Sequence, residues 1–126
     1  MAEAKRITGG CHCGATKFSV SWAPEGVTRC TCSNCARRGA LWAYYPLKEF
    51  MLETPRKNVS TYQWGPKIGK YNFCAVCGNS TFNETPDWTT GEANFENPLI
   101  TINARLLDDI DAEALPVTVL DGKNLW

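Results

Sequence analysis

Seven cysteines gather in three short clusters, at spacings that are typical of zinc ligands. The clusters are Cys11-His12-Cys13, Cys30-Thr31-Cys32-Ser33-Asn34-Cys35 and Cys74-Ala75-Val76-Cys77. In the third cluster two residues separate the sulfurs, and the Gly78 that follows permits the positive φ of a tight metal-binding turn. In the first cluster, extended backbone would point Cys11 and Cys13 to one side and His12 to the other. Each of these two clusters can therefore offer two sulfurs to one tetrahedral ion.

The first and third clusters together predict a closed four-thiolate site that joins segments about 60 residues apart. This partition leaves the middle cluster, Cys30, Cys32 and Cys35, with three ligands. An ion held by three protein ligands keeps one coordination position for water or substrate, which is the mark of a catalytic site. Spacing does not force the partition, because Cys74 and Cys77 could instead close a site with two members of the middle cluster.

Three other interpretations of the cysteines compete with this one. Disulfides would use at most six of the seven cysteines, and the sequence shows no secretory signal. A redox-active Cys-x-x-Cys pair is disfavoured because no βαβ pattern surrounds Cys74 to Cys77. The third alternative is that both sites are structural. The chain is then a non-catalytic zinc-binding interaction module, which binds a partner through loop residues such as Trp64 and Trp88.

A zinc ion with three thiolates carries a charge of about −1, and this charge favours one kind of chemistry. Such an ion should acidify bound water less than a neutral three-histidine site does, so simple hydrolysis is disfavoured. A thiol substrate suits the open position better, because coordination removes its proton at neutral pH. The expected reaction is the addition of a thiol to an electrophilic carbon, or its release from one.

Several side chains near the clusters have both a functional and a structural interpretation. Arg37 and Arg38 follow the middle cluster, where they could bind a substrate carboxylate or lie solvated on the surface. His12 is the sole histidine, and we expect it to be an outward-facing structural residue. Asn103 and Arg105 are expected to pin the end of a strand. Four aromatic residues could wall a pocket or belong to the core: Trp42, Tyr44, Tyr45 and Trp64.

Length and composition predict one soluble domain over residues 1–126, with 44% hydrophobic and 21% charged residues. Lys+Arg and Asp+Glu are equal at 13 each, so the charge indicates neither a nucleic-acid partner nor a membrane surface. Seven thiolates and two zinc ions would bring the loaded protein to about −3. The first ten residues contain no apolar segment, so we expect a cytoplasmic protein whose cysteines bind metal. The sequence leaves the oligomeric state open.

The chain is expected to be mainly β, with short strands that position the cysteines. Strict alternation at Phe18 to Trp22 is typical of a half-buried strand. Further strands are expected at 41–45, 70–73, 99–103 and 116–120. Residues 106–115 carry apolar side chains at fourfold spacing, enough for one or two helical turns, and the polar stretch 83–98 is expected to be a long loop.

The cysteine clusters and the chain around them resemble the glutathione-dependent formaldehyde-activating enzymes, a family grouped with centromere-protein-V-like domains. Beyond the clusters, the matching residues are Gly10, Gly14, Gly39-Ala40, Phe73, Gly78, Ile102 to Asp108 and Asp121-Gly122. The resemblance spans nearly the whole chain.

The resemblance implies a small, zinc-stapled beta-tent fold of short antiparallel strands with little helix. It implies two zinc ions: a structural ion on Cys11, Cys13, Cys74 and Cys77, and a catalytic ion on Cys30, Cys32 and Cys35. The family's named activity is a carbon-sulfur lyase reaction, in which glutathione and formaldehyde combine to S-hydroxymethylglutathione. This agrees with the thiol chemistry that the charge of the site favours.

Overall fold

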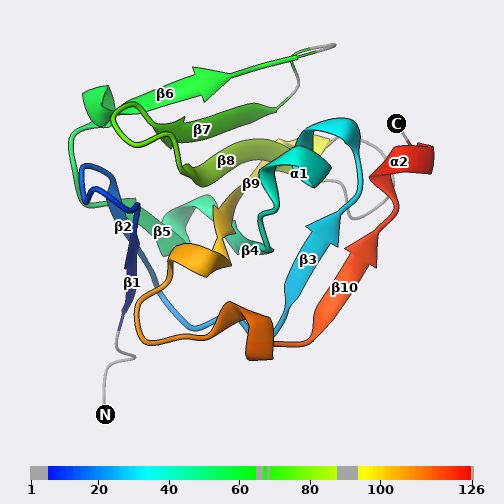
Figure 1. Cartoon of the computed structure of the whole chain (residues 1–126). Helices are drawn as coiled ribbons and strands as arrows, with labels where there is room; N and C mark the ends of the chain where they lie inside the picture. Colours follow the sequence, from blue (N-terminus) through cyan, green and yellow to red (C-terminus); the bar gives the residue numbers. More distant parts are fainter. Residues whose placement is uncertain (1–5, 65–66, 68, 88–93, 126) are drawn as a thin grey trace.

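The computed structural model describes residues 6–64, 67, 69–87 and 94–125, and in them the chain is mainly β, as predicted (Figure 1). The strands are β1 (Ile7–Gly10), β2 (Lys17–Val20), β3 (Val27–Cys30), β4 (Trp42–Pro46), β5 (Phe50–Leu52), β6 (Val59–Tyr62), β7 (Lys70–Cys74), β8 (Ser80–Asp87), β9 (Asn94–Asn103) and β10 (Val117–Leu120). The helices are α1 (Ser33–Arg38) and α2 (Gly122–Leu125). No described helix has the length and apolar character needed to cross a membrane.

The strands form a sheet of three, β1-β2-β5, and a sheet of seven, β10-β3-β4-β9-β8-β7-β6. The strand pairs are antiparallel except for β10 and β3, which run parallel (Figure 1). The five strands expected from the sequence correspond to β2, β4, β7, β9 and β10. The order of the large sheet places β3, which leads into the middle cysteines, beside the last strand of the chain.

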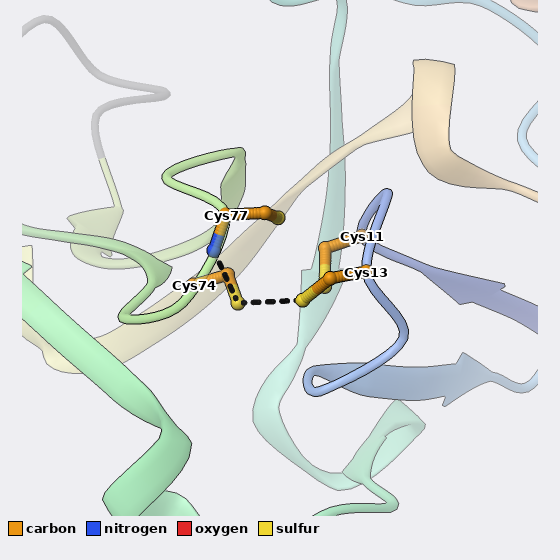
Figure 2. Close-up of side chains that lie close together, drawn as sticks. All are labelled: Cys11, Cys13, Cys74 and Cys77. Atoms are coloured by element: carbon orange, nitrogen blue, oxygen red, sulfur yellow. Dashed lines mark hydrogen bonds between the residues drawn. The ribbon is translucent and has the colours of Figure 1, made fainter.

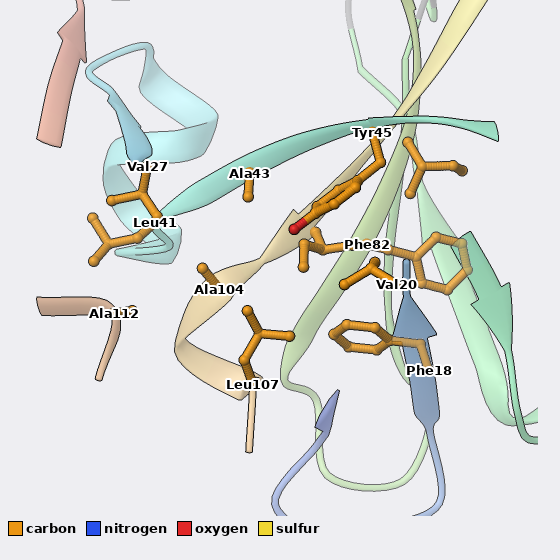
Figure 3. Close-up of a cluster of buried hydrophobic side chains, with 12 residues drawn as sticks. Phe18, Val20, Val27, Leu41, Ala43, Tyr45, Phe82, Ala104, Leu107 and Ala112 are labelled. Atoms are coloured by element: carbon orange, nitrogen blue, oxygen red, sulfur yellow. The ribbon is translucent and has the colours of Figure 1, made fainter. Parts of the chain in front are cut away.

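The main hydrophobic core lies between the two sheets (Figure 3). Phe18 of β2 stacks on Phe50 of β5 at 5.8 Å between ring centroids, and Phe50 contacts Phe82 of β8 at 4.8 Å. This chain of rings therefore connects the small sheet to the large one. Tyr45 of β4 is 1% exposed, and its hydroxyl donates to the carbonyl of Trp22 at 3.0 Å.

A second, smaller cluster lies on the other face of the large sheet. Successive side chains of a strand point to opposite faces, so Trp42 points away from the core that receives Ala43 and Tyr45. Trp42 packs there with Ala40 and the three middle cysteines, at 2% exposure. The two faces of β4 thus separate the stabilising core from the cysteine cluster.

One expectation about local structure is met by 3₁₀ turns and another is corrected. Of the one or two helical turns expected in 106–115, the turn Ala112–Ala114 lies within this range, and the turn Ala104–Leu106 reaches only its first residue. The Asn103 and Asp111 side chains each accept a hydrogen bond at the start of these turns. Within 83–98, the described residues belong to β8 and β9 rather than to a loop, and residues 88–93 lie outside the described part of the chain.

Gly9 lies where β1 meets the core, and its replacement by alanine is expected to destabilise the domain. An added Cβ would lie 2.9 Å from the backbone oxygen of Leu106 and 2.9 Å from Cζ of Phe18. Such overpacking costs about 1–3 kcal/mol, which urea denaturation would measure as a lower unfolding free energy. Gly69→Ala is the matched control, because its Cβ would meet its neighbours at 3.4 Å. Equal stability of the two variants would contradict this interpretation of β1.

Candidate metal centres

The first and third cysteine clusters face each other across two tight turns (Figure 2). Gly14 and Gly78, each directly after the second cysteine of its pair, both have φ of 81°. Their N–H groups close the turns onto the carbonyls of Cys11 and Cys74, at 3.1 and 2.9 Å. The positive φ expected at Gly78 is therefore found, and Gly14 repeats it. Glycine alone adopts this backbone readily.

The four sulfurs of these turns are spaced as a tetrahedral zinc site requires. All four Sγ atoms lie within 4.8 Å of one another. The Cys11–Cys13 and Cys13–Cys74 sulfur distances are 3.7 and 3.6 Å. Zinc–sulfur bonds of about 2.3 Å place tetrahedral sulfurs about 3.8 Å apart, so the set fits zinc. The structure thus pairs the first cluster with the third, and not the third with the middle one.

Backbone N–H groups point at the sulfurs and stabilise their thiolate form. The pKa of Cys74 is lowered to about 6: burial opposes this shift, but the N–H groups of Cys77 and Val76 outweigh it. The N–H of Thr16 likewise donates to the sulfur of Cys11 at 3.3 Å. Donors of this kind are the usual second layer of a thiolate metal site.

Asn79 connects the two turns. Its side-chain oxygen accepts the backbone N–H of His12 at 2.8 Å, and its carbonyl accepts the N–H of Cys74 at 2.9 Å. The His12 side chain is exposed, as expected for an outward-facing structural residue. Asn79 therefore holds the first and third clusters in register.

Replacement of Asn79 by alanine is expected to weaken metal retention while leaving all seven sulfurs in place. Loss of an outer hydrogen-bonding partner typically lowers metal affinity by about 10–100-fold. Zinc transfer to a chromophoric chelator would measure it, with Val76→Ala as control because that side chain lies in the turn of the third cluster and is 71% exposed. Equal transfer curves for the two variants would rule out the connecting role of Asn79.

The middle cysteines, Cys30, Cys32 and Cys35, form a trio where β3 ends and α1 begins. Cys32 is the N-cap of α1, and its sulfur accepts the N–H of Cys35 at 3.3 Å. The sulfurs of Cys30, Cys32 and Cys35 lie within 4.8 Å of one another, and all three residues are buried. Gly39, with φ of 63°, ends the helix after six residues. A cysteine cap and a short helix thus bring three sulfurs together.

The thiols of the trio hold their protons unequally. The pKa of Cys30 is lowered to about 6, first by a hydrogen bond from the Cys35 side chain and then by the N–H groups of Cys32 and Gly122, against burial. The same Cys35–Cys30 bond, with burial, raises the pKa of Cys35. A proton is therefore shared between the sulfurs of Cys30 and Cys35, and metal binding to thiolates releases such protons.

The C-terminal segment closes over this trio. The N–H of Thr31 donates to the carbonyl of Leu120 at 3.0 Å, and the Thr31 hydroxyl accepts the N–H of Lys123 at 3.3 Å. Gly122 lies close enough to hydrogen-bond Cys30. The Asp121-Gly122 pair noted in the sequence therefore belongs to the site.

Two buried donors beside the trio have no partner among the described residues: Nδ2 of Asn34 and Nε1 of Trp42. Asn34 lies between Cys32 and Cys35 in the chain, and Trp42 packs on the trio. Unpaired buried donors are uncommon and usually indicate an absent water, ion or ligand. Together with three sulfurs, they fit a site that holds a metal and one further group.

An open pocket of about 470 Å³ lies beside α1, the helix that contains Cys35. It is lined by Ser33, Asn34, Arg37, Arg38, Tyr62 and Trp64. Tyr71 lies nearby, and its pKa is raised to about 12 by burial and by the charges of the trio, while a hydrogen bond with Trp64 opposes this. Of the aromatic residues considered above, Trp64 therefore lines a pocket, whereas Trp42 and Tyr45 are buried and Tyr44 is exposed on the sheet face.

Asn103 and Arg105 pin a strand end, as expected. Asn103 donates to the carbonyl of Ser80 at 3.0 Å, and Arg105 donates to the carbonyl of Gly39 at 3.0 Å. Asn34, Tyr62 and Tyr71 were not predicted from the sequence as residues of the site, because no local motif indicates that β6 and β7 approach α1.

Comparisons with known proteins agree with this geometry. A family model described as "Glutathione-dependent formaldehyde-activating enzyme" matches residues 6–119. Among solved structures, the chain is similar to the crystal structure of a Rhodobacter sphaeroides protein, a structural genomics target, with 28% identity and a TM-score of 0.72. That likeness covers 88% of this chain and 99% of the other.

Proposed function

Because the chain belongs to the glutathione-dependent formaldehyde-activating enzyme family, we propose that it is a zinc-dependent carbon–sulfur lyase. It joins glutathione or a similar thiol to formaldehyde or another small aldehyde. The new bond links the thiol sulfur to the aldehyde carbon, and the thiol proton ends on the carbonyl oxygen. The reaction therefore balances without a further reactant.

The observation that carries the proposal is the three-sulfur set of Cys30, Cys32 and Cys35. Among the described residues, no fourth cysteine, histidine or carboxylate completes this set. We assign Cys11, Cys13, Cys74 and Cys77 to a structural zinc and the trio to a second, catalytic zinc. Zinc on the trio would supply a cationic centre that favours the thiolate form of a bound thiol.

Neighbouring side chains support the same chemistry. The Tyr71 hydroxyl is protonated at neutral pH, as tyrosine ordinarily is, and burial raises its pKa further, to about 12. The Trp64 indole has only a donor, so in its hydrogen bond the Tyr71 oxygen accepts. The hydroxyl proton of Tyr71 is thereby left to donate towards an oxygen in the site, such as that of the aldehyde.

The test is the rate of S-hydroxymethylglutathione formation. Formaldehyde and glutathione combine without a catalyst, so exchange spectroscopy at equilibrium should measure interconversion with and without zinc-loaded protein. We expect acceleration that is lost on chelation and restored by zinc. An unchanged exchange rate with two zinc ions bound per chain would exclude this substrate pair, and would favour a non-catalytic zinc-binding interaction module. Trp88, a candidate partner-binding residue of such a module, lies outside the described residues.

A further inference from the structure

Two neighbouring arginines line the pocket beside the trio, but they are held very differently. Arg38 donates through Nε to Oδ1 of Asn34 and through Nη1 to Oγ of Ser80, both at 3.0 Å. Its guanidinium lies 5.6 Å from the ring centroid of Tyr62 and 5.9 Å from that of Tyr71. Arg38 thus connects α1 to β6, β7 and β8 of the large sheet.

Arg37 is exposed and makes one contact among the described residues, from Nη1 to the carbonyl of Ser33 at 2.9 Å. Its Nε and Nη2 atoms remain for another partner, and together they form the edge of a guanidinium that binds a carboxylate in bidentate fashion. The described ion pairs involve Arg56 and Arg105 instead. Among the described residues, Arg37 is therefore a pocket cation whose Nε and Nη2 donors can bind a ligand.

The pocket is open to solvent, and its lining suits a small anionic molecule. Pockets of about 300–1,000 Å³ are usual for such ligands. None of the six lining residues is acidic, and two are arginines. Tyr62 and Trp64 add apolar surface for a flexible chain. Asn34 lines the pocket and lies between two ligands of the trio, so a thiol at the trio would extend its other end into this pocket.

We propose that Arg37 determines specificity by binding a carboxylate of the thiol substrate, while Arg38 positions Asn34 and the pocket wall. This inference rests on the proposed function and deepens it, because it restricts the thiol to those that carry a carboxylate several bonds from sulfur. A neutral thiol of similar reactivity gains nothing from Arg37.

The experiment separates binding from reaction. S-Methylglutathione, whose sulfur is blocked, is titrated calorimetrically into zinc-loaded wild type, Arg37→Gln and Arg29→Gln. Arg29 is an exposed arginine of β3 outside the pocket lining, so it is the matched control. We expect the Kd to rise about tenfold in Arg37→Gln, the loss typical of one charge-assisted pair, and to stay unchanged in Arg29→Gln. The dimethyl ester of S-methylglutathione should bind all three proteins equally weakly.

Each outcome decides for or against the role of Arg37. Equal Kd values for wild type and Arg37→Gln, or no binding of S-methylglutathione to wild type, would overturn it. Equal losses in both arginine variants would show a general effect of net charge and overturn it as well. No turnover enters these titrations, so absence of acceleration in the exchange assay would reject the lyase reaction without changing the measured contribution of Arg37 to binding.

Discussion

Replacement of Cys74 by serine is expected to prevent stable folding of the domain. Cys74 is fully buried at the end of β7, and its sulfur accepts N–H groups from Val76 and Cys77. It shares the proposed structural zinc with Cys11 and Cys13, which lie on the turn between β1 and β2. Loss of that zinc ion would remove the link between the small sheet and β7. The serine hydroxyl would not replace the thiolate as a zinc ligand.

We expect the free energy of unfolding to fall by at least about 4 kcal/mol, a loss typical of variants that lose a bound metal. This is a large part of the roughly 5–15 kcal/mol that stabilises a typical domain. Thermal unfolding followed by circular dichroism would measure it. Val76→Ala is the matched control, since this side chain sits in the same turn but is 71% exposed. It should unfold like the wild type.

A chelator provides the second arm of this test. It should lower the melting temperature of the wild type towards that of Cys74→Ser, and should affect the variant much less, because binding energy at a structural zinc site is folding energy. A Cys74→Ser protein with two bound zinc ions and wild-type melting would contradict the structural assignment of the four-cysteine site.

The local geometry of the first and third cysteine clusters followed from their spacing, because each cluster forms its own turn. Two sulfurs separated by one or two residues, with glycine next, fold into the same turn wherever the chain goes. What spacing left open was the partner of the third cluster. That choice is made by strand order, since β7 ends beside the β1–β2 turn.

The strands of 83–98 could not be found from sequence because prolines interrupt them. Pro86 lies where the pairing of β8 with β9 shifts register, between Thr85 and Asp87. Pro98 lies just before Leu99, which is the first residue of β9 that pairs with β4. Both sites tolerate proline, since bulges and one-sided stretches need fewer N–H donors, but only the assembled sheet reveals this.

The helix that presents the trio was also missed. Cysteine is not among the usual N-cap residues, so Cys32 gave no start signal for α1. Arg37, Arg38 and Trp64 were candidates from the sequence, but the other residues around the pocket were missed for a different reason. Arg38 contacts Tyr62, Tyr71 and Ser80, which are far from it in the chain. Such contacts follow from tertiary packing and leave no local pattern.

Replacement of Cys32 by serine is expected to abolish the lyase reaction while the domain stays folded. Serine is nearly the same shape as cysteine and is a favoured N-cap, so its hydroxyl can accept the N–H of Cys35 as the sulfur does. The substitution removes one of the three thiolates that we assign to the catalytic zinc. We expect zinc content to fall from two ions per chain to one, and the exchange rate to fall to the uncatalysed value.

Cys32→Ala distinguishes the ligand from the cap. Alanine removes both, so it should be less stable than Cys32→Ser by about 1 kcal/mol, yet both variants should be equally inactive. Their unfolding should remain far milder than that of Cys74→Ser, because the main core lies on the other face of the sheet. If Cys32→Ser instead unfolded as completely as Cys74→Ser, both cysteine sites would be structural. If it kept the acceleration, the trio would not be the site of the reaction.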